Sequence, residues 1–230
     1  METAMASNAP KIIGAVTVGQ APRLDIAPDV EAIFGAQLRL EQAGALDDVT
    51  DFAAIEPDEG DFTLVSLLRD GRSVLFAERK ILPNLQRAIN RLEDKGASAI
   101  MVWCTGEFPD CITANVPLIY PNRLLAGMVH TLRPKRLAVI MPDASQLDEA
   151  RTRWTGLVDA VDMHATSPYG DGAEESLART AARIAEDGAD LVILDCMGFS
   201  PADKAHVEGI CRCPVLLPRT LTARVAREIA

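Results

Sequence analysis

Two cysteines, Cys104 and Cys196, stand at the ends of similar apolar runs, in "AIMVWCTGEF" and "LVILDCMGFS". Each is followed two residues later by a glycine, which is typical of a buried strand that gives way to a turn. A thiolate can remove a proton from a carbon beside a carboxylate, and a thiol on the opposite side can return one. Two such cysteines facing one molecule would invert a stereocentre without a cofactor. This chemistry requires a fold that brings the two thiols together.

An internal repeat meets that requirement. Three pairs of segments match in the same order, namely 87–108 with 179–200, 10–17 with 134–141, and 116–129 with 213–226. In the first pair, the two cysteines and the glycines that follow them coincide at a constant offset of 92 residues. A repeat of this length indicates a duplicated half-structure, so we expect two similar lobes.

The elements in each half alternate between short Val/Ile/Leu runs and stretches of helical periodicity. This predicts an α/β fold of two pseudo-symmetric lobes, each a mainly parallel sheet with helices on both faces. Ligands of such sheets bind beyond the carboxyl ends of the strands, which predicts an active-site cleft between the lobes. We expect one lobe at residues 1–121 and the other at 122–217. The first carries a β-hairpin insertion near 62–79, and a C-terminal helix at 218–230 is a candidate to complete it.

Composition narrows the class of protein. The 230 residues carry a net charge of −10, which argues against partners such as nucleic acid or an anionic membrane. No run approaches the ~18 apolar residues of a membrane span, and the N-terminus does not resemble a leader. Five scattered cysteines fit a reducing compartment, so we expect a cytoplasmic protein. Cys211 and Cys213 have no second cysteine pair to complete a metal site, so we expect no metal. The sequence also lacks a phosphate-binding glycine motif, so we expect no cofactor.

The loop after the first strand lies at the same predicted sheet edge as the cysteines. Its candidates for substrate binding are Thr17, Gly19, Gln20 and Arg23. Arg23 is a candidate carboxylate clamp, because a guanidinium offers two parallel donors to a carboxylate. The alternative is a surface arginine that pairs with Asp25 or Asp29.

The turns that follow the cysteines are candidates as well. Thr105 and Gly106 in the first half, and Met197 and Gly198 in the second, can offer free N–H groups to a carboxylate or an enolate. A thiol at a helix N-terminus or beside a cation has its pKa lowered from ~8.5 to values of ~3.5 to 7.5. We expect the turns to provide such a setting.

Three further residues have competing interpretations. Arg79 follows the hairpin and could add positive potential, although a charged strand end in solvent explains it equally well. Ser145 could bond a ligand oxygen or cap a helix. Asp195 precedes Cys196 and would raise the thiol pKa or act as its hydrogen-bond partner. Its role stays open at this point.

Four segments carry a resemblance to a known family: "TVGQAPR" at 17–23, "ERK" at 78–80, "MPDASQ" at 141–146 and "LDCMGF" at 194–199. They resemble the AroM family over essentially the whole chain, and that family looks like a branch of the aspartate/glutamate/hydantoin racemase superfamily. The superfamily includes racemases, a maleate isomerase and an arylmalonate decarboxylase. The resemblance implies flavodoxin-like lobes, Cys104 and Cys196 as acid and base, Thr105 as a carboxylate ligand, and a homodimer or larger assembly.

The resulting hypothesis is a cofactor-independent racemase or isomerase of a small carboxylic acid, either an amino acid or a cyclic derivative. In the amino-acid racemases of the superfamily, Asn-Thr typically follows the first cysteine and Thr the second. Here the neighbours are Thr-Gly-Glu at 105–107 and Met-Gly-Phe at 197–199, so the substrate is not readable. Decarboxylation and non-catalytic binding of a carboxylate are the alternatives.

Overall fold

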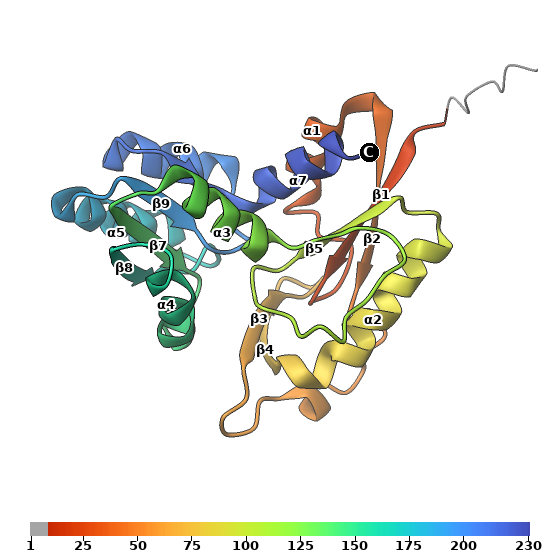
Figure 1. The fold of residues 1–230 in the computed structure, drawn as a ribbon. Helices are drawn as coiled ribbons and strands as arrows, with labels where there is room; N and C mark the ends of the chain where they lie inside the picture. The colour runs from red at the N-terminus through yellow and green to blue at the C-terminus, as the bar shows by residue number, and fades with distance from the viewer. Residues whose placement is uncertain (1–8) are drawn as a thin grey trace, which may run out of the picture.

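The computed structural model describes residues 9–230, so the expected start of the first lobe and the N-terminal segment assessed for a leader lie partly outside it. The chain forms two four-stranded sheets in which every strand pair is parallel. The first sheet has the order β2-β1-β5-β6, with β1 at Lys11–Thr17, β2 at Leu38–Gly44, β5 at Ala99–Trp103 and β6 at Leu118–Ile119. The second has the equivalent order β8-β7-β9-β10, with β7 at Arg136–Met141, β8 at Ala160–Ala165, β9 at Leu191–Leu194 and β10 at Val215–Leu216. The predicted pair of similar α/β lobes is confirmed (Figure 1).

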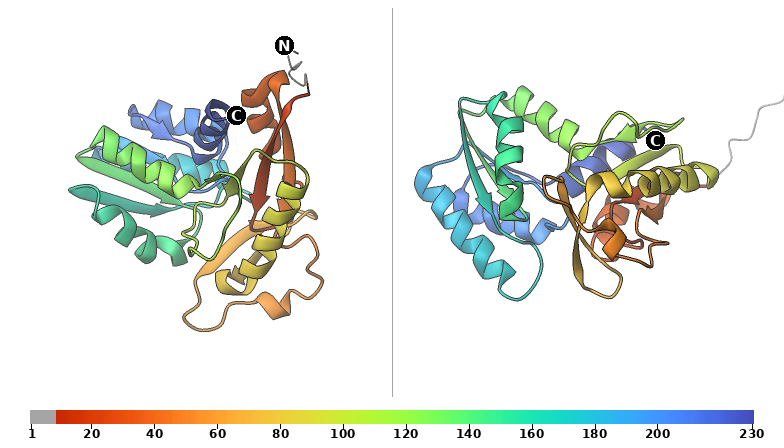
Figure 2. Two further views of the ribbon diagram at one scale, coloured as in Figure 1. Left: turned by 45° about the vertical axis from the view of Figure 1, so that its right-hand side comes forward. Right: turned by 90° about the horizontal axis from the view of Figure 1, so that it is seen from below.

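Helices cover both faces of each sheet (Figures 1 and 2). In the first lobe, α2 (Glu78–Asp94) covers one face, and α1 (Ala27–Phe34) and α7 (Pro218–Glu228) cover the other. In the second lobe, α5 (Ala173–Asp187) and α6 (Pro201–Cys211) cover one face, and α3 (Pro121–Leu132) and α4 (Leu147–Thr155) cover the other. Short 3-10 turns lie at Gly35–Gln37, Ala53–Ile55 and Ala144–Gln146.

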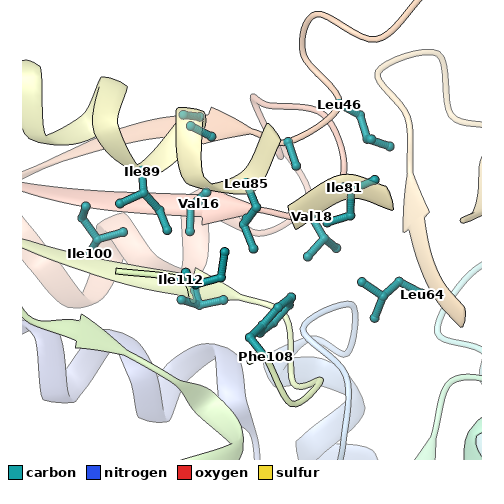
Figure 3. Packing of buried hydrophobic residues seen from close by; sticks show 14 of the residues in the cluster. Val16, Val18, Leu46, Leu64, Ile81, Leu85, Ile89, Ile100, Phe108 and Ile112 are labelled. Atoms are coloured by element: carbon teal, nitrogen blue, oxygen red, sulfur yellow. The ribbon is translucent and has the colours of Figure 1, made fainter. Parts of the chain in front are cut away.

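Helix α2 shows how the sequence pattern produces this packing. Its buried residues include Ile81, Leu85, Ile89 and Leu92, which recur every three or four positions and therefore form one apolar stripe. The stripe packs against residues of the first sheet such as Val16, as Figure 3 shows. The central strands β5 and β9 are buried along their whole length, as continuous apolar runs in a parallel sheet should be.

The C-terminal helix α7 belongs to the core of the first lobe. Ala223 and Ala226 are fully buried in one cluster with Ile13 of β1 and Val30 of α1, although the preceding strand β10 lies in the second lobe. Its counterpart in the repeat, α3, packs in the second lobe through Leu125. The chain therefore crosses between the lobes twice, and the C-terminus lies beside α1 (Figure 1).

The long insertion of the first half folds as an antiparallel hairpin of β3 (Thr63–Leu67) and β4 (Ser73–Ala77). Its tip contains Gly71 in a left-handed conformation, with a φ of 84°, which glycine adopts without a steric penalty. In the second view of Figure 2, the hairpin lies between the lobes. No helix within residues 9–230 is long and apolar enough to cross a bilayer.

Candidate active site

Cys104 and Cys196 line the same cavity, which residues of both lobes and of the hairpin enclose. Cys104 follows β5 and Cys196 follows β9, so the two thiols leave equivalent central strands at their carboxyl ends. Phe62 and Leu64 contribute apolar surface from the hairpin side, and Met141 does so from the second lobe. The two thiols therefore line one cavity from different lobes.

The two cysteine turns share one kind of hydrogen bond to sulfur. The N–H of Gly106 donates to the sulfur of Cys104 at 3.4 Å, and the N–H of Gly198 donates to the sulfur of Cys196 at 3.3 Å. Gly198 also allows the side chain of Tyr169 to approach the turn closely, because a Cβ atom at position 198 would lie 2.3 Å from the Tyr169 hydroxyl oxygen. All four turn residues predicted to bind substrate line the cavity, namely Thr105, Gly106, Met197 and Gly198.

Asp195 connects the two turns instead of contacting the thiol next to it. Its side chain is fully buried, and Arg153 of α4 donates to one carboxylate oxygen at 2.5 Å. The same guanidinium donates to the carbonyl oxygen of Thr105 at 3.0 Å, and the Thr105 hydroxyl donates to the carbonyl oxygen of Asp195 at 3.1 Å. These bonds cross the boundary between the lobes directly beside both cysteines.

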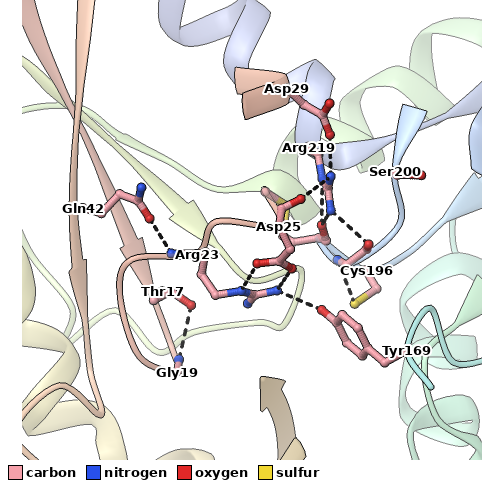
Figure 4. Close-up of polar contacts among 12 residues, drawn as sticks. Thr17, Gly19, Arg23, Asp25, Asp29, Gln42, Tyr169, Cys196, Ser200 and Arg219 are labelled. Carbon is pink, nitrogen blue, oxygen red and sulfur yellow. Dashed lines mark hydrogen bonds and ion pairs between the residues drawn. The ribbon is translucent and has the colours of Figure 1, made fainter. Parts of the chain in front are cut away.

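Arg23 lines the cavity but is already paired. Its Nε and Nη2 atoms donate to the two carboxylate oxygens of Asp25 at 2.8 and 2.6 Å, and Nη2 also donates to the hydroxyl of Tyr169 at 2.9 Å (Figure 4). The side chain is nearly buried, with 6% exposed. It therefore combines features of the two interpretations of the sequence, since it faces the cavity and it pairs with Asp25.

A second buried arginine, Arg219 at the start of α7, holds the turn after Cys196. It donates to the carbonyl oxygens of Met197 and Gly198 at 2.9 Å each, and it forms an ion pair with Asp29 (Figure 4). A guanidinium that binds carbonyl groups on one side of this turn fixes the direction of the peptide N–H groups on the other side. The C-terminal helix thereby helps to position the Gly198 N–H against the sulfur.

The chain matches the AroM protein family over residues 13–230. It belongs to the AroM family. A comparison with curated protein sequences gives no significant match.

Solved structures similar to this AroM-family protein include an allantoin racemase from Pseudomonas fluorescens, with a TM-score of 0.67, 16% identity and 95% and 90% of the two chains covered. An unliganded arylmalonate decarboxylase has a TM-score of 0.62 at 15% identity, with 95% and 91% covered. An aspartate racemase from Picrophilus torridus has a TM-score of 0.56 at 12% identity, with 95% and 94% covered. At these identities, the likeness establishes a shared two-lobe fold.

Both thiols of the AroM-family protein are harder to ionise than a free cysteine. Burial raises the pKa of Cys104 to about 12, and the Gly106 N–H only partly opposes it. Burial also raises the pKa of Cys196, against the opposing effect of the Gly198 N–H and of nearby arginines. The sequence led us to expect lowered values at helix N-termini. The structure differs because a loop follows Cys104, and α6 begins only at Pro201.

Acidic side chains gather on the Cys104 side of the cavity. Glu107 and Glu149 line it, and both add to the effect of burial, which raises the pKa of the neighbouring Glu78 to about 7. Within residues 9–230, none of the three carboxyl groups forms an ion pair. The surroundings of Cys196 contain Arg23 and Arg219 instead. The cavity thus has an acidic side and a side with paired arginines.

Several residues proposed from the sequence organise loops beside the cavity without lining it. The Thr17 hydroxyl oxygen accepts the Gly19 N–H at 3.3 Å, and a Cβ at Gly19 would collide with the side chain of Ser66. Gln20 donates to the carbonyl oxygen of Leu46 and accepts the N–H of Arg69. These contacts fix the loop that carries Arg23.

Arg79 and Ser145 also lie outside the lining. Arg79 is exposed and pairs with Asp58 and Asp61, while the Ser145 hydroxyl donates to Asp143 at 2.6 Å. The sequence reasoning missed six polar residues that do line the cavity, and these are Ser66, Glu107, Gln146, Glu149, Arg153 and Tyr169. Within residues 9–230, no group of three or more His, Cys, Asp or Glu side chains could hold a metal ion.

Proposed function

We propose that this AroM-family protein is a racemase or isomerase that moves a proton at a carbon beside the carboxylate of a small acid, with Cys104 and Cys196 as acid and base. The observation that carries the proposal is that both thiols line one cavity from equivalent strand ends of two duplicated lobes. A small amino acid or a cyclic derivative is the substrate class. No cofactor takes part in this reaction.

The proton transfers balance without any other reactant. The Cys196 thiolate takes the proton from carbon, and the electron pair of the broken C–H bond moves into the carboxylate to form an enediolate. The Cys104 thiol then gives its proton to the opposite face of the same carbon, which leaves a thiolate at Cys104 and a thiol at Cys196. Cys196 is the base in the free enzyme, because Arg23 and Arg219 favour its thiolate while Glu78 opposes that of Cys104.

The supporting comparison is the shared fold. Allantoin racemase, aspartate racemase and arylmalonate decarboxylase all match the chain over at least 95% of its length. These three enzymes are named for two kinds of reaction, namely racemisation and decarboxylation. A decarboxylase is therefore the second candidate function, and the high pKa of Cys104 favours it, since decarboxylation needs only one thiol to protonate the enediolate.

Incubation in deuterium oxide tests the proposal. Amino acids, hydantoins and dicarboxylates are incubated with the protein, and deuterium at the α-carbon and optical rotation are followed. The wild type is compared with Cys104→Ala, Cys196→Ala and the control Cys111→Ala, which removes an exposed thiol outside the cavity lining. Racemisation predicts inversion in the wild type and the control, and loss of inversion in both cavity variants.

Other outcomes identify the alternatives. Arylmalonates serve as the decarboxylation probe, and release of carbon dioxide that survives Cys104→Ala but not Cys196→Ala indicates a decarboxylase. A ligand that raises the melting temperature without any exchange at carbon indicates a binding protein. Full inversion by either cavity variant contradicts the two-thiol mechanism.

A further inference from the structure

The hydroxyl group of Tyr169 lies in the cavity beside Cys196 and has no role in the reaction described above. Tyr169 belongs to the loop between β8 and α5, and its ring lies close to Cys196 and Arg23 in Figure 4. Its hydroxyl oxygen also lies against Gly198, where a Cβ would approach to 2.3 Å. The phenol therefore stands next to the turn whose N–H binds the Cys196 sulfur.

Neighbouring groups hold this side chain in place. Arg23 donates to the hydroxyl oxygen at 2.9 Å, and Asp25 fixes the guanidinium with two further bonds. In the loop itself, the N–H of Tyr169 donates to the Ser167 hydroxyl oxygen at 3.1 Å, and that hydroxyl donates to the carbonyl oxygen of Tyr169 at 3.1 Å. A rigid donor of this kind needs little reorganisation when a ligand binds.

The hydrogen of the Tyr169 hydroxyl has no acceptor among residues 9–230, because the one bond of this group is the one that it accepts from Arg23. A phenol can donate one hydrogen bond and accept others, so the donor capacity of Tyr169 is unused. Burial raises the pKa of the hydroxyl, and Cys196 adds to the effect, so the group stays protonated. A protonated donor that lines the cavity is suited to bind an anionic oxygen.

We propose that Tyr169 is a catalytic residue whose hydroxyl donates a hydrogen bond to a carboxylate oxygen of the substrate, on the Cys196 side of the cavity. When the C–H bond breaks, negative charge grows on that oxygen and strengthens the bond, so that Tyr169 stabilises the enediolate. Arg23 is a positioning residue, which acts by orienting and polarising the phenol. This inference rests on the proposed function, because it assigns the oxygen-binding group of that reaction.

Replacement by phenylalanine removes the hydroxyl and keeps the ring. Loss of one oxyanion donor typically lowers kcat by roughly 10²- to 10³-fold. For any panel member that exchanges deuterium, we expect Tyr169→Phe to lower kcat by about this factor while KM changes only a few-fold. Tyr120→Phe is the matched control, since Tyr120 does not line the cavity. A Tyr169→Phe variant with wild-type kcat contradicts the inference and leaves the proposed function intact.

A second measurement does not require activity. The chain has only two tyrosines, so labelling with [¹³Cζ]tyrosine gives two NMR signals, which Tyr169→Phe assigns. Propanoate and L-alanine serve as probes, and we expect either to shift the Tyr169 signal and leave that of Tyr120 in place. No shift of the Tyr169 signal at saturating probe overturns the inference. A shift without deuterium exchange by any panel member supports the hydrogen bond while the proposed function fails.

Discussion

The bond between Arg153 and Asp195 gives a stability prediction whose size follows from burial. The Asp195 side chain is fully buried and that of Arg153 is 13% exposed, with 2.5 Å between the paired atoms. Arg153→Met removes the guanidinium, keeps an apolar chain of similar length and leaves a buried carboxylate without a counter-charge. It also removes the bond to the carbonyl oxygen of Thr105.

Breaking one partner of a buried ion pair costs about 3 to 5 kcal/mol. In a chain of this size, each kcal/mol lowers the melting temperature by ~2 to 4 °C, so we expect a fall of roughly 6 to 20 °C. The matched control is Arg136→Met in the same lobe, where the pair with Asp162 spans 3.2 Å and its side chains are 46% and 40% exposed. An exposed pair of this kind contributes about 0 to 1 kcal/mol.

The pH dependence of the stability loss in Arg153→Met tests whether the buried carboxylate causes it. Burial raises the pKa of the folded-state Asp195 carboxyl above its unfolded value of ~3.9 even in the wild type, and removing Arg153 takes away the largest opposing effect, so this pKa rises further in the variant. The folded variant then binds a proton more tightly than the unfolded chain, so its stability falls as the pH rises above that value. The melting temperature of Arg153→Met should therefore lie further below that of the wild type at pH 8 than at pH 5.

Thermal melting followed by circular dichroism at both pH values measures these quantities. Adding Asp195→Asn to Arg153→Met removes the buried charge and should recover part of the melting temperature. Equal losses for Arg153→Met and Arg136→Met, or a deficit that does not depend on pH, would refute the argument that an uncompensated buried carboxylate causes the loss.

Three further predictions concern the cavity. Iodoacetamide at pH 8 should label Cys196 before Cys104, because two arginines favour the Cys196 thiolate, and peptide mass spectrometry measures the order; the reverse order contradicts the assigned base. The rate of deuterium exchange should rise between pH 7 and 9, since both thiol pKa values are raised, whereas a rate that is constant over this range contradicts them. Glu107→Gln and Glu149→Gln should each improve the binding of succinate relative to propanoate in thermal-shift titrations, because the unpaired carboxylates that line the cavity repel a second negative charge; an unchanged ratio argues against this charge selection.

The internal repeat explains why so much of the architecture could be predicted. The offset that aligns Cys104 with Cys196 predicts two lobes of the same topology, and the apolar runs before them are typical of central strands of parallel sheets, as the structure has them. Placing both cysteines at strand ends followed from the same pattern. The shared cavity depends on how the two lobes pack against each other. The sequence suggested that packing only through the expected symmetry of the lobes.

The side chains that complete the cavity were less predictable. Arg153 lies on α4, whose sequence also contains Arg151, and nothing in the spacing shows which of the two faces Asp195. Tyr169 lies in the loop between β8 and α5, outside the three pairs of segments that match in the repeat. Thr17 ends β1 and Gln20 lies in the loop that follows, at the expected sheet edge. The Thr17 hydroxyl bonds to Gly19 in that same loop and Gln20 bonds to neighbouring loops, since a position at a strand end does not determine where a side chain points.

Each thiol accepts a hydrogen bond from an equivalent backbone N–H, but the charged side chains around the two thiols differ. This difference predicts that the two single-cysteine variants exchange deuterium differently. In Cys104→Ala, the Cys196 thiolate can still remove a proton from one enantiomer and return a deuteron to the same face. We therefore expect exchange into that enantiomer without inversion. In Cys196→Ala, burial still raises the pKa of Cys104 and keeps its thiol mostly protonated, so exchange into either enantiomer should be much slower at pH 8.

Enantiomerically pure substrate in deuterium oxide, followed by chiral chromatography and mass spectrometry, distinguishes the two variants. Comparable exchange by both, each into the opposite enantiomer, would mean that the thiols are equivalent bases. The charges around the cavity would then have little influence on the reaction. Exchange by Cys104→Ala alone would instead show that the arginines beside Cys196 determine which thiol starts the reaction, although each sulfur accepts the same kind of glycine N–H.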